Sequence, residues 1–191
     1  MSGLRERKKA LTRASIQRNA LRLFRERGYE ATTVAQIVTA SEISESTFFR
    51  YFPTKEDVLL WDRFDPIIYE ALQDQPAQTR IIPALRAAIR ESLDRVPEAE
   101  RREIRERTEL ILSTPALRAM MVDRLEEPMR TLMEIVAARS GRAATDPEVR
   151  AVVGAIIGVG LTVLLTAPQT GGDLVALLDE GLAALETGLR L

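Results

Sequence analysis

Three helix starts lie close together in one short segment, and they constrain the fold more than any other feature of this chain. Thr33 with Gln36 forms the pattern of a capping box, and so does Thr54 with Asp57. In this pattern the threonine side chain accepts a hydrogen bond from a backbone N–H at the helix start. Ser44 between them is a good N-cap for another helix. We therefore predict three short helices, with the segment "SEIS" turning the chain between the first two.

A longer helix is predicted before these three, over residues 12–27. Its apolar residues recur at helical spacing, and Gly28 after it suits a left-handed cap. These apolar residues are Ile16, Ala20, Leu23 and Phe24. A first helix followed by two short helices with a tight turn between them is the helix-turn-helix pattern, whose last helix lies in the DNA major groove.

Four of the nine aromatic residues fall within five consecutive positions, in "TFFRYF". This segment belongs to the last helix of the predicted helix-turn-helix, the recognition helix. Phe48 and Phe52 are four residues apart, so they share one helix face and can bury in a core that must be very small. Pro53 then ends the helix. The residues left near the DNA side are Phe49 and Tyr51 with Ser46, Thr47 and Arg50.

The charge of the chain is unevenly distributed. Residues 1–55 contain eleven Lys or Arg and five Asp or Glu, whereas the remainder contains sixteen and twenty-three. The first part therefore carries a net charge of +6 and the second −7, although the total is only −1. This asymmetry predicts that the first part meets a polyanion and the second part does not.

Composition argues against an enzyme. The chain contains no His and no Cys, which excludes Ser-His-Asp triads, thiolate nucleophiles, disulfides and Cys/His zinc sites. An enzyme would have to rely on carboxylates, and the sequence shows no obvious catalytic partner for Glu103, Glu106 and Glu109, which share one helix face. We expect no metal, no cofactor and no catalytic residue.

The segment "TTVAQIVTASEISESTFFRYFPTKEDVL" resembles the DNA-binding domain of the TetR family of bacterial transcriptional repressors. The resemblance implies an all-α homodimer with about nine helices, in which a small-molecule ligand in the C-terminal domain weakens operator binding. It also implies a helix-turn-helix DNA-binding domain over residues 1–54 and a ligand-binding and dimerisation domain over residues 55–191.

The resemblance assigns DNA contacts by position. Residues that would contact phosphate are Thr33, Thr47, Tyr51 and Lys55. Residues placed for base-edge contacts are Ser44, Glu45 and Ser46. The basic arm of Arg5, Arg7, Lys8 and Lys9 would reach flanking phosphates or the minor groove.

Two positions depart from the family pattern. Glu42 stands where the family usually has a turn glycine, which predicts a non-glycine residue at positive φ. Glu45 stands where the family often has a basic residue. Its carboxylate would either accept a hydrogen bond from cytosine N4 or point away from the phosphates, and we favour the second because DNA repels an unpaired carboxylate.

The C-terminal part is predicted to hold an apolar effector pocket. A long helix is expected from Pro115 through "ALRAMMVDRLEEPMRTLMEIVAAR", kinked at Pro128. Four of the five methionines fall in it, and methionine fills irregular space, so it suits an adaptable pocket as well as an ordinary core. The predicted ligand-binding residues are Trp61, Phe64, Ile89, Ile111, Met120, Met121, Leu125, Met129 and Met133.

The segment "AVVGAIIGVGLTVLLTA" has no charge over seventeen residues, the lower limit for a membrane span. A membrane-associated helical adaptor is therefore an alternative reading. We favour a helix buried between two subunits, because an amphipathic helix follows it and no basic segment flanks it. The predicted dimer-interface residues are Gly154, Gly158, Leu161, Leu178, Leu182 and Leu185, and the glycines would permit close backbone approach.

Together these features predict a ligand-responsive regulator, most simply a repressor, that binds a near-palindromic operator as a homodimer. The segments "FRYFPTKEDVLLWDRFDP" and "ILSTPALRA" resemble a branch of the family with acyl-CoA-like ligands, although other hydrophobic ligands and an activator role stay open. The charged start "LRERKK" is not followed by an apolar segment, so no secretory signal is predicted and we expect a cytoplasmic protein.

Overall fold

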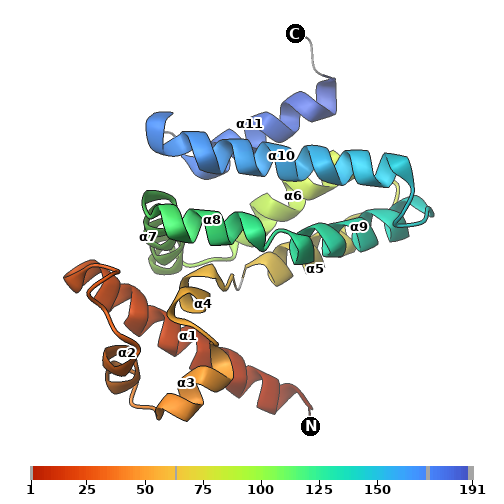
Figure 1. The fold of residues 1–191 in the computed structure, drawn as a ribbon. Helices are drawn as coiled ribbons and strands as arrows, with labels where there is room; N and C mark the ends of the chain where they lie inside the picture. The colour runs from red at the N-terminus through yellow and green to blue at the C-terminus, as the bar shows by residue number, and fades with distance from the viewer. Residues whose placement is uncertain (1, 63, 171–172, 189–191) are drawn as a thin grey trace. The chain divides into compact units, whose positions relative to one another are not determined.

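The computed structural model describes the backbone of residues 2–62, 64–170 and 173–188, and side chains over residues 7–62, 64–166 and 173–188. These residues form helices and no strands (Figure 1), which confirms the all-α prediction. The helices are α1 (Ser2–Arg27), α2 (Val34–Ala40), α3 (Glu45–Tyr51), α4 (Lys55–Leu60), α5 (Asp65–Asp74), α6 (Ile81–Asp94), α7 (Glu98–Ser113), α8 (Pro115–Asp123), α9 (Glu126–Ser140), α10 (Pro147–Thr170) and α11 (Leu174–Thr187).

The chain divides into two compact units. The first unit, which we call the head, comprises residues 1–62 and 102–111. The second unit, the body, comprises residues 63–101 and 112–191. Helix α7 contributes its middle to the head and both its ends to the body.

The head is built from the predicted caps. Both capping boxes are complete, at Thr33 for α2 and at Thr54 for α4, and the Ser44 side chain accepts from the Thr47 N–H at the start of α3. Each cap satisfies backbone donors that a short helix would otherwise leave open. Phe48 and Phe52 are fully buried, which confirms the prediction that they form the core face of α3.

Helix α1 starts earlier than predicted. It begins at Ser2 rather than at Thr12. The added residues are mainly Leu, Arg, Lys, Glu and Ala, which all have high helix propensity, and no proline interrupts them. Helical periodicity of apolar residues, the basis of the prediction, is a signal that a charged helical extension does not carry.

Two helices stop earlier than their sequences indicate. The segment "KEDVLLWDRF" after the second capping box is typical of one helix, but α4 ends at Leu60, where Trp61 takes an extended conformation. The long helix from Pro115 is not kinked at Pro128 but interrupted before it, at Arg124 and Leu125. Pro128 then lies in the first turn of α9, where its missing N–H costs nothing because first-turn donors have no partner within the helix.

The core of the body gathers side chains from α5, α6, α9, α10 and α11. In Figure 1 these helices lie against one another, with α10 and α11 side by side. Residues of this core include Leu72, Leu85, Leu132, Val153 and Leu182. One tight approach lies between α10 and α11, where a Cβ added to Gly181 would stand 2.5 Å from Val159 Cγ1.

Candidate nucleic-acid interface

The turn between α2 and α3 positions α3, the recognition helix of the predicted helix-turn-helix. Glu42 has a φ of 53°, in the left-handed region, so the predicted positive φ at a non-glycine residue is confirmed. The Glu42 N–H donates to Thr39 O at 3.2 Å, and the Ile43 N–H donates to Val38 O at 3.2 Å. These two bonds hold a conformation that is strained for glutamate.

The outer face of α3 carries polar groups and one ring. Ser44, Glu45, Ser46 and Arg50 are exposed, and Phe49 is 49% exposed although it is a large apolar residue. Phe49 packs edge-on against buried Phe48, with ring centroids 5.4 Å apart. The residue types on this face can hydrogen-bond base edges and contact a thymine methyl group.

Three hydroxyl groups meet at the start of α3. The Ser44 Oγ lies 2.9 Å from the Ser46 Oγ and donates to Thr47 Oγ1 at 2.9 Å, while it accepts from the Thr47 N–H at 3.1 Å. Ser44 and Ser46 are exposed and Thr47 is half-buried. A hydroxyl can turn to donate or accept, so this cluster can adapt to a phosphate or a base edge.

The residues predicted to contact phosphate have different surroundings. Thr33 is exposed at the start of α2, where its backbone N–H donates to Gln36 Oε1. Tyr51 is half-buried beneath the Arg50 guanidinium, whose carbon lies 5.4 Å from the ring centroid. Lys55 points inward instead, and its Nζ donates to Tyr29 O at 3.0 Å and to Thr32 O at 3.1 Å.

Tyr29 and Glu56 form a polar pair next to Lys55. The Tyr29 hydroxyl donates to the Glu56 carboxylate. Burial and this hydrogen bond raise the pKa of Tyr29 above its ordinary value. Burial opposes ionisation of Glu56, but hydrogen bonds from Tyr29 and from the backbone outweigh it and hold the pKa of Glu56 below its ordinary value. The carboxylate therefore stays ionised where the start of α4 meets the segment that follows α1.

The predicted basic arm is part of α1. Arg7, Lys8 and Lys9 are exposed. The side chain of Arg5 lies outside the described residues. The contact of this arm with DNA stays a prediction.

Sequence reasoning missed three side chains that hold the head together. Gln17 Nε2 donates at 2.8 Å to the carbonyls of both Val58 and Trp61. Arg107 of α7, only 7% exposed, donates to Trp61 O at 2.6 Å and to the Asp62 carboxylate. These donors meet the carbonyls at the end of α4, which is why the helix can stop at Leu60.

Arg13 is the third missed side chain. It donates to Tyr51 O at 3.0 Å, and its guanidinium carbon lies 5.1 and 5.0 Å from the ring centroids of Phe52 and Trp61. The only sequence signal is that Arg13 precedes Ile16 and Ala20 by three and seven residues. It therefore falls on the apolar stripe of α1, where an ordinary surface arginine would not.

The predicted effector residues are divided between the two units. Trp61 and Ile111 belong to the head, where the Trp61 ring packs against Phe52. The other members belong to the body and are half-buried: Phe64, Ile89, Met120, Met121, Leu125, Met129 and Met133. A hollow of about 310 Å³ in the body is lined instead by Arg80 and residues 81–83 of α6, by Ala151, Val152 and Ala155 of α10, and by Leu185 and Glu186 of α11.

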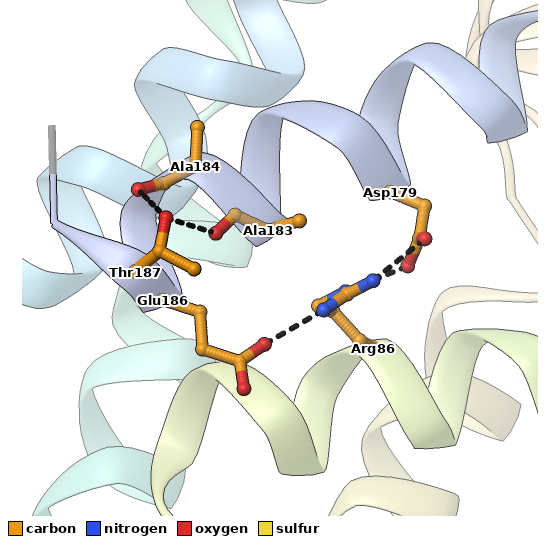
Figure 2. A network of polar contacts seen from close by, with 6 residues as sticks. All are labelled: Arg86, Asp179, Ala183, Ala184, Glu186 and Thr187. Atoms are coloured by element: carbon orange, nitrogen blue, oxygen red, sulfur yellow. Dashed lines mark hydrogen bonds and ion pairs between the residues drawn. The ribbon is translucent and has the colours of Figure 1, made fainter. Parts of the chain in front are cut away.

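A polar network joins α6 to α11 within the body (Figure 2). Arg86 donates through Nε and Nη2 to the two oxygens of Asp179, each at 2.8 Å, and through Nη1 to Glu186 at 2.7 Å. The hydrogen bonds from Arg86 hold the pKa of Asp179 below its ordinary value, against the opposing effect of desolvation. The two-pronged geometry fixes the angle between the helices as well as their distance.

The predicted dimer residues lie on two different faces. Gly154 and Gly158 are exposed on α10, and a Cβ added at either would meet nothing within 4 Å. Leu182 is only 1% exposed and belongs to the body's own core, against which Leu178 and Leu185 pack. Leu161 is half-buried.

Helix α10 leaves much of its apolar surface uncovered. Residues 147–166 have a mean hydropathy of 2.1, and only 17% of that stretch is buried within the chain. Its length and composition alone would allow it to cross a membrane. Among the described residues it is the one helix that meets this criterion, and a helix that packs on a partner meets it equally well.

The head has a net positive charge and contains a helix-turn-helix whose recognition helix, α3, has an exposed polar face. These features define a DNA-binding regulator. Residues 16–60 match the family model described as "Bacterial regulatory proteins, tetR family", and residues 79–190 match that of the "MftR C-terminal domain". The chain belongs to the TetR family of bacterial transcriptional regulators. Members of this family are regulators and not enzymes.

Three known proteins illustrate the relationship. The HTH-type transcriptional regulator TcmR of Streptomyces glaucescens is 39% identical over 146 residues, which cover 73% of this chain and 65% of TcmR. MftR of Mycobacterium tuberculosis is 28% identical over 159 residues, which cover 82% of this chain and 79% of MftR. The repressor FadR of Thermus thermophilus, solved with lauroyl-CoA, has a TM-score of 0.55 at 25% identity and covers 94% of this chain and 95% of its own.

Proposed function

We propose that the protein is a repressor that binds a near-palindromic operator as a homodimer and is released by a hydrophobic or acyl-CoA-like effector in the cytoplasm. The observation that carries the proposal is the outer face of α3, where Ser44, Ser46 and Phe49 are exposed beside the buried Phe48. One such face reads only a few base pairs. Two faces held about 34–36 Å apart would read two half-sites.

In this proposal Ser44, Ser46 and Phe49 face the base edges, and Glu45 lies at their margin. Thr33, Thr47 and Tyr51 contact phosphate. The test is selection of bound duplexes from a random library. Ser46→Ala should change base preference at one position of each half-site, whereas Ser140→Ala, an exposed hydroxyl in the body, should not. A chain that enriches no sequence would contradict the proposal.

The exposed face of α10 is proposed as the dimer interface. Gly154, Gly158, Leu161 and exposed Leu165 would meet their counterparts in a second copy, and the absence of a Cβ would allow close approach. Leu178 and Leu185 would flank it, and Leu182, buried in its own unit, is left out. Native mass spectrometry should show a dimer for the wild type and a monomer for Gly158→Arg. The control Glu134→Arg on the exposed face of α9 should remain a dimer.

The same measurement separates this proposal from a membrane-associated adaptor. A chain that spans or lies on a membrane through α10 would need detergent to stay dispersed. A dimer obtained without detergent supports the interface. Detergent-dependent monomers would support the adaptor instead.

The proposed effector is an acyl-CoA-like molecule. Two observations support this choice: the similarity to FadR, which was solved with lauroyl-CoA, and the half-buried methionines Met120, Met121, Met129 and Met133 on α8 and α9. Flexible thioether side chains can repack around an acyl chain. The other proposed contacts within the body are Phe64, Ile89 and Leu125.

The effector test is titration of lauroyl-CoA into the protein bound to a selected duplex, followed by fluorescence anisotropy. Lauroyl-CoA should release the DNA and free CoA should not. Met129→Trp, which fills the proposed site, should raise the concentration needed for release. Release by uncharged hydrophobic compounds alone would assign a multidrug-type effector, and tighter DNA binding would indicate an activator or co-repressor response.

A further inference from the structure

Two cations of the head point into the protein. The Lys55 ammonium donates to the carbonyls of Tyr29 and Thr32, and its nitrogen lies 4.1 Å from the centroid of the Tyr29 ring. An ammonium has three N–H donors. Two of them are therefore occupied by the connection between α1 and α2, and the ring covers one side of the charge.

Arg13 is held in a comparable way at the C-terminal end of α3. Its Nη2 donates to Tyr51 O, in the last turn of the recognition helix α3. The helix dipole favours a positive charge at this end. The guanidinium lies close to the Phe52 and Trp61 rings, and its Nε is buried. The side chain thus links α1 to the end of α3 and to the residue that follows α4.

We propose that Arg13 and Lys55 are positioning residues, and that neither neutralises a DNA phosphate. Arg13 fixes the end of α3 against α1, and Lys55 fixes α4 against the connection between α1 and α2. The inference rests on DNA binding by the head and reassigns Lys55, which the sequence resemblance places on phosphate. Turning Lys55 outward would remove its donors from two backbone carbonyls and its charge from the Tyr29 ring. Such a rearrangement would weaken the attachment of α4 to the connection between α1 and α2 at the moment of binding.

The cation of α3 that remains for DNA is Arg50. It is exposed, and its described contact is with the ring of Tyr51, itself a proposed phosphate contact. Arg50 therefore serves as the matched comparison for the two inward cations, since all three carry one positive charge and lie in the same unit. Only a cation that neutralises phosphate releases a counterion on binding.

The salt dependence of binding measures this difference directly. Each neutralised phosphate contributes about −0.9 to the slope of log K against log salt concentration, for any duplex sequence. Removing one such contact makes the slope shallower by about 0.9, so the loss of affinity between 50 and 200 mM salt becomes about 3.5-fold smaller. A positioning residue changes the affinity by a similar factor at every salt concentration and leaves the slope unchanged.

The experiment uses the full chain and a random-sequence duplex labelled for fluorescence anisotropy. The variants are Arg50→Gln, Arg13→Gln and Lys55→Gln, because glutamine removes the charge but keeps an N–H donor and so preserves folding better than an apolar residue. We expect Arg50→Gln to flatten the slope and leave the urea midpoint unchanged. Arg13→Gln and Lys55→Gln should keep the wild-type slope and lower the midpoint followed by Trp61 fluorescence.

The slope and the urea midpoint together decide whether each cation positions the helices or contacts phosphate. A shallower slope for Lys55→Gln or Arg13→Gln, with an unchanged midpoint, would overturn the inference and place that residue on phosphate. An unchanged slope together with an unchanged midpoint would also overturn it, because a positioning residue must stabilise the head. If even the wild type fails to bind duplex with a measurable salt slope, DNA binding by this head is itself refuted.

Discussion

Replacement of Arg107 by methionine should destabilise the head more than any other single charge removal in it. The guanidinium, whose side chain is 8% exposed, donates to Trp61 O, to Leu59 O at 3.4 Å and to the Asp62 carboxylate. Methionine keeps the length and apolar contacts of the side chain but removes every one of these donors. Of the side-chain donors described at the end of α4, Gln17 then remains.

The magnitude follows from the burial of the two partners. Removing one member of a fully buried ion pair costs about 3–5 kcal/mol. The Asp62 side chain is 29% exposed, so water recovers part of that cost, and we expect a loss of about 2–3 kcal/mol. With a urea dependence of about 2 kcal/mol per molar, the midpoint should fall by roughly 1–1.5 M.

Trp61 makes the assay specific to the head. It is the single tryptophan of the chain, and its own carbonyl accepts from Arg107. Urea unfolding followed by Trp61 fluorescence therefore reports on the unit that the mutation perturbs. The matched control is Arg102→Met, an exposed arginine on the same helix and in the same unit, which should move the midpoint by less than about 0.3 M because surface charges contribute little.

One outcome would contradict the stabilising role of Arg107. If Arg107→Met unfolds at the urea concentration of the Arg102→Met control, the guanidinium does not stabilise the end of α4, and the bonds described there are not formed in solution. Arg107→Lys should give an intermediate midpoint, because one ammonium can replace the charge but not the planar set of donors.

Three further predictions concern the body. Gly181→Ala should lower the thermal midpoint and reduce the free energy of unfolding by about 1–3 kcal/mol, because its Cβ would meet Val159 Cγ1 at 2.5 Å. A second change, Val159→Ala, should restore part of this loss, and Gly154→Ala should cause none. Arg139→Met should speed amide exchange in residues 75–80, because the Arg139 guanidinium donates to the carbonyls of Leu72, Gln75, Pro76 and Thr79; unchanged exchange there would contradict this role. Arg86 keeps the pKa of Asp179 low. The ion pair therefore stabilises the fold above the ordinary aspartate pKa of about 4, and this stabilisation is lost as pH falls through the lowered value. Below about pH 4, Asp179→Asn should lose less thermal stability than the wild type.

The parts of the fold that the sequence predicts are those with local chemical causes. Thr33 and Gln36 are three residues apart and complete their capping box without help from the rest of the chain. Thr54 and Asp57 complete their capping box in the same way. The left-handed turn at Glu42 is likewise a local feature of a few adjacent residues. Phe48 and Phe52 are buried as predicted, because their spacing of four residues fixes them on one face of any helix that includes both.

The parts that escape sequence reasoning depend on residues far apart in the chain. Arg107 lies 45 residues from Asp62, and nothing near either residue indicates that they meet. Gly181 looks like an ordinary helix glycine until Val159 of α10 is placed beside it, whereas Gly154 and Gly158, which were expected to allow close approach, face open space in the single chain. The inward direction of Lys55 likewise depends on where the carbonyls of Tyr29 and Thr32 lie.

The path of α7 limits how this regulator can be recombined with its relatives. Because residues 102–111 count with the head while the helix on either side counts with the body, the backbone passes from one unit to the other three times. A chimera joined at a single point after Asp62 would combine a foreign α4 and its following residues with the native Arg107, and the guanidinium would keep backbone acceptors there but not its Asp62 carboxylate partner. Grafting of operator specificity onto another effector domain should therefore succeed only when the α7 segment is exchanged along with the first sixty-two residues.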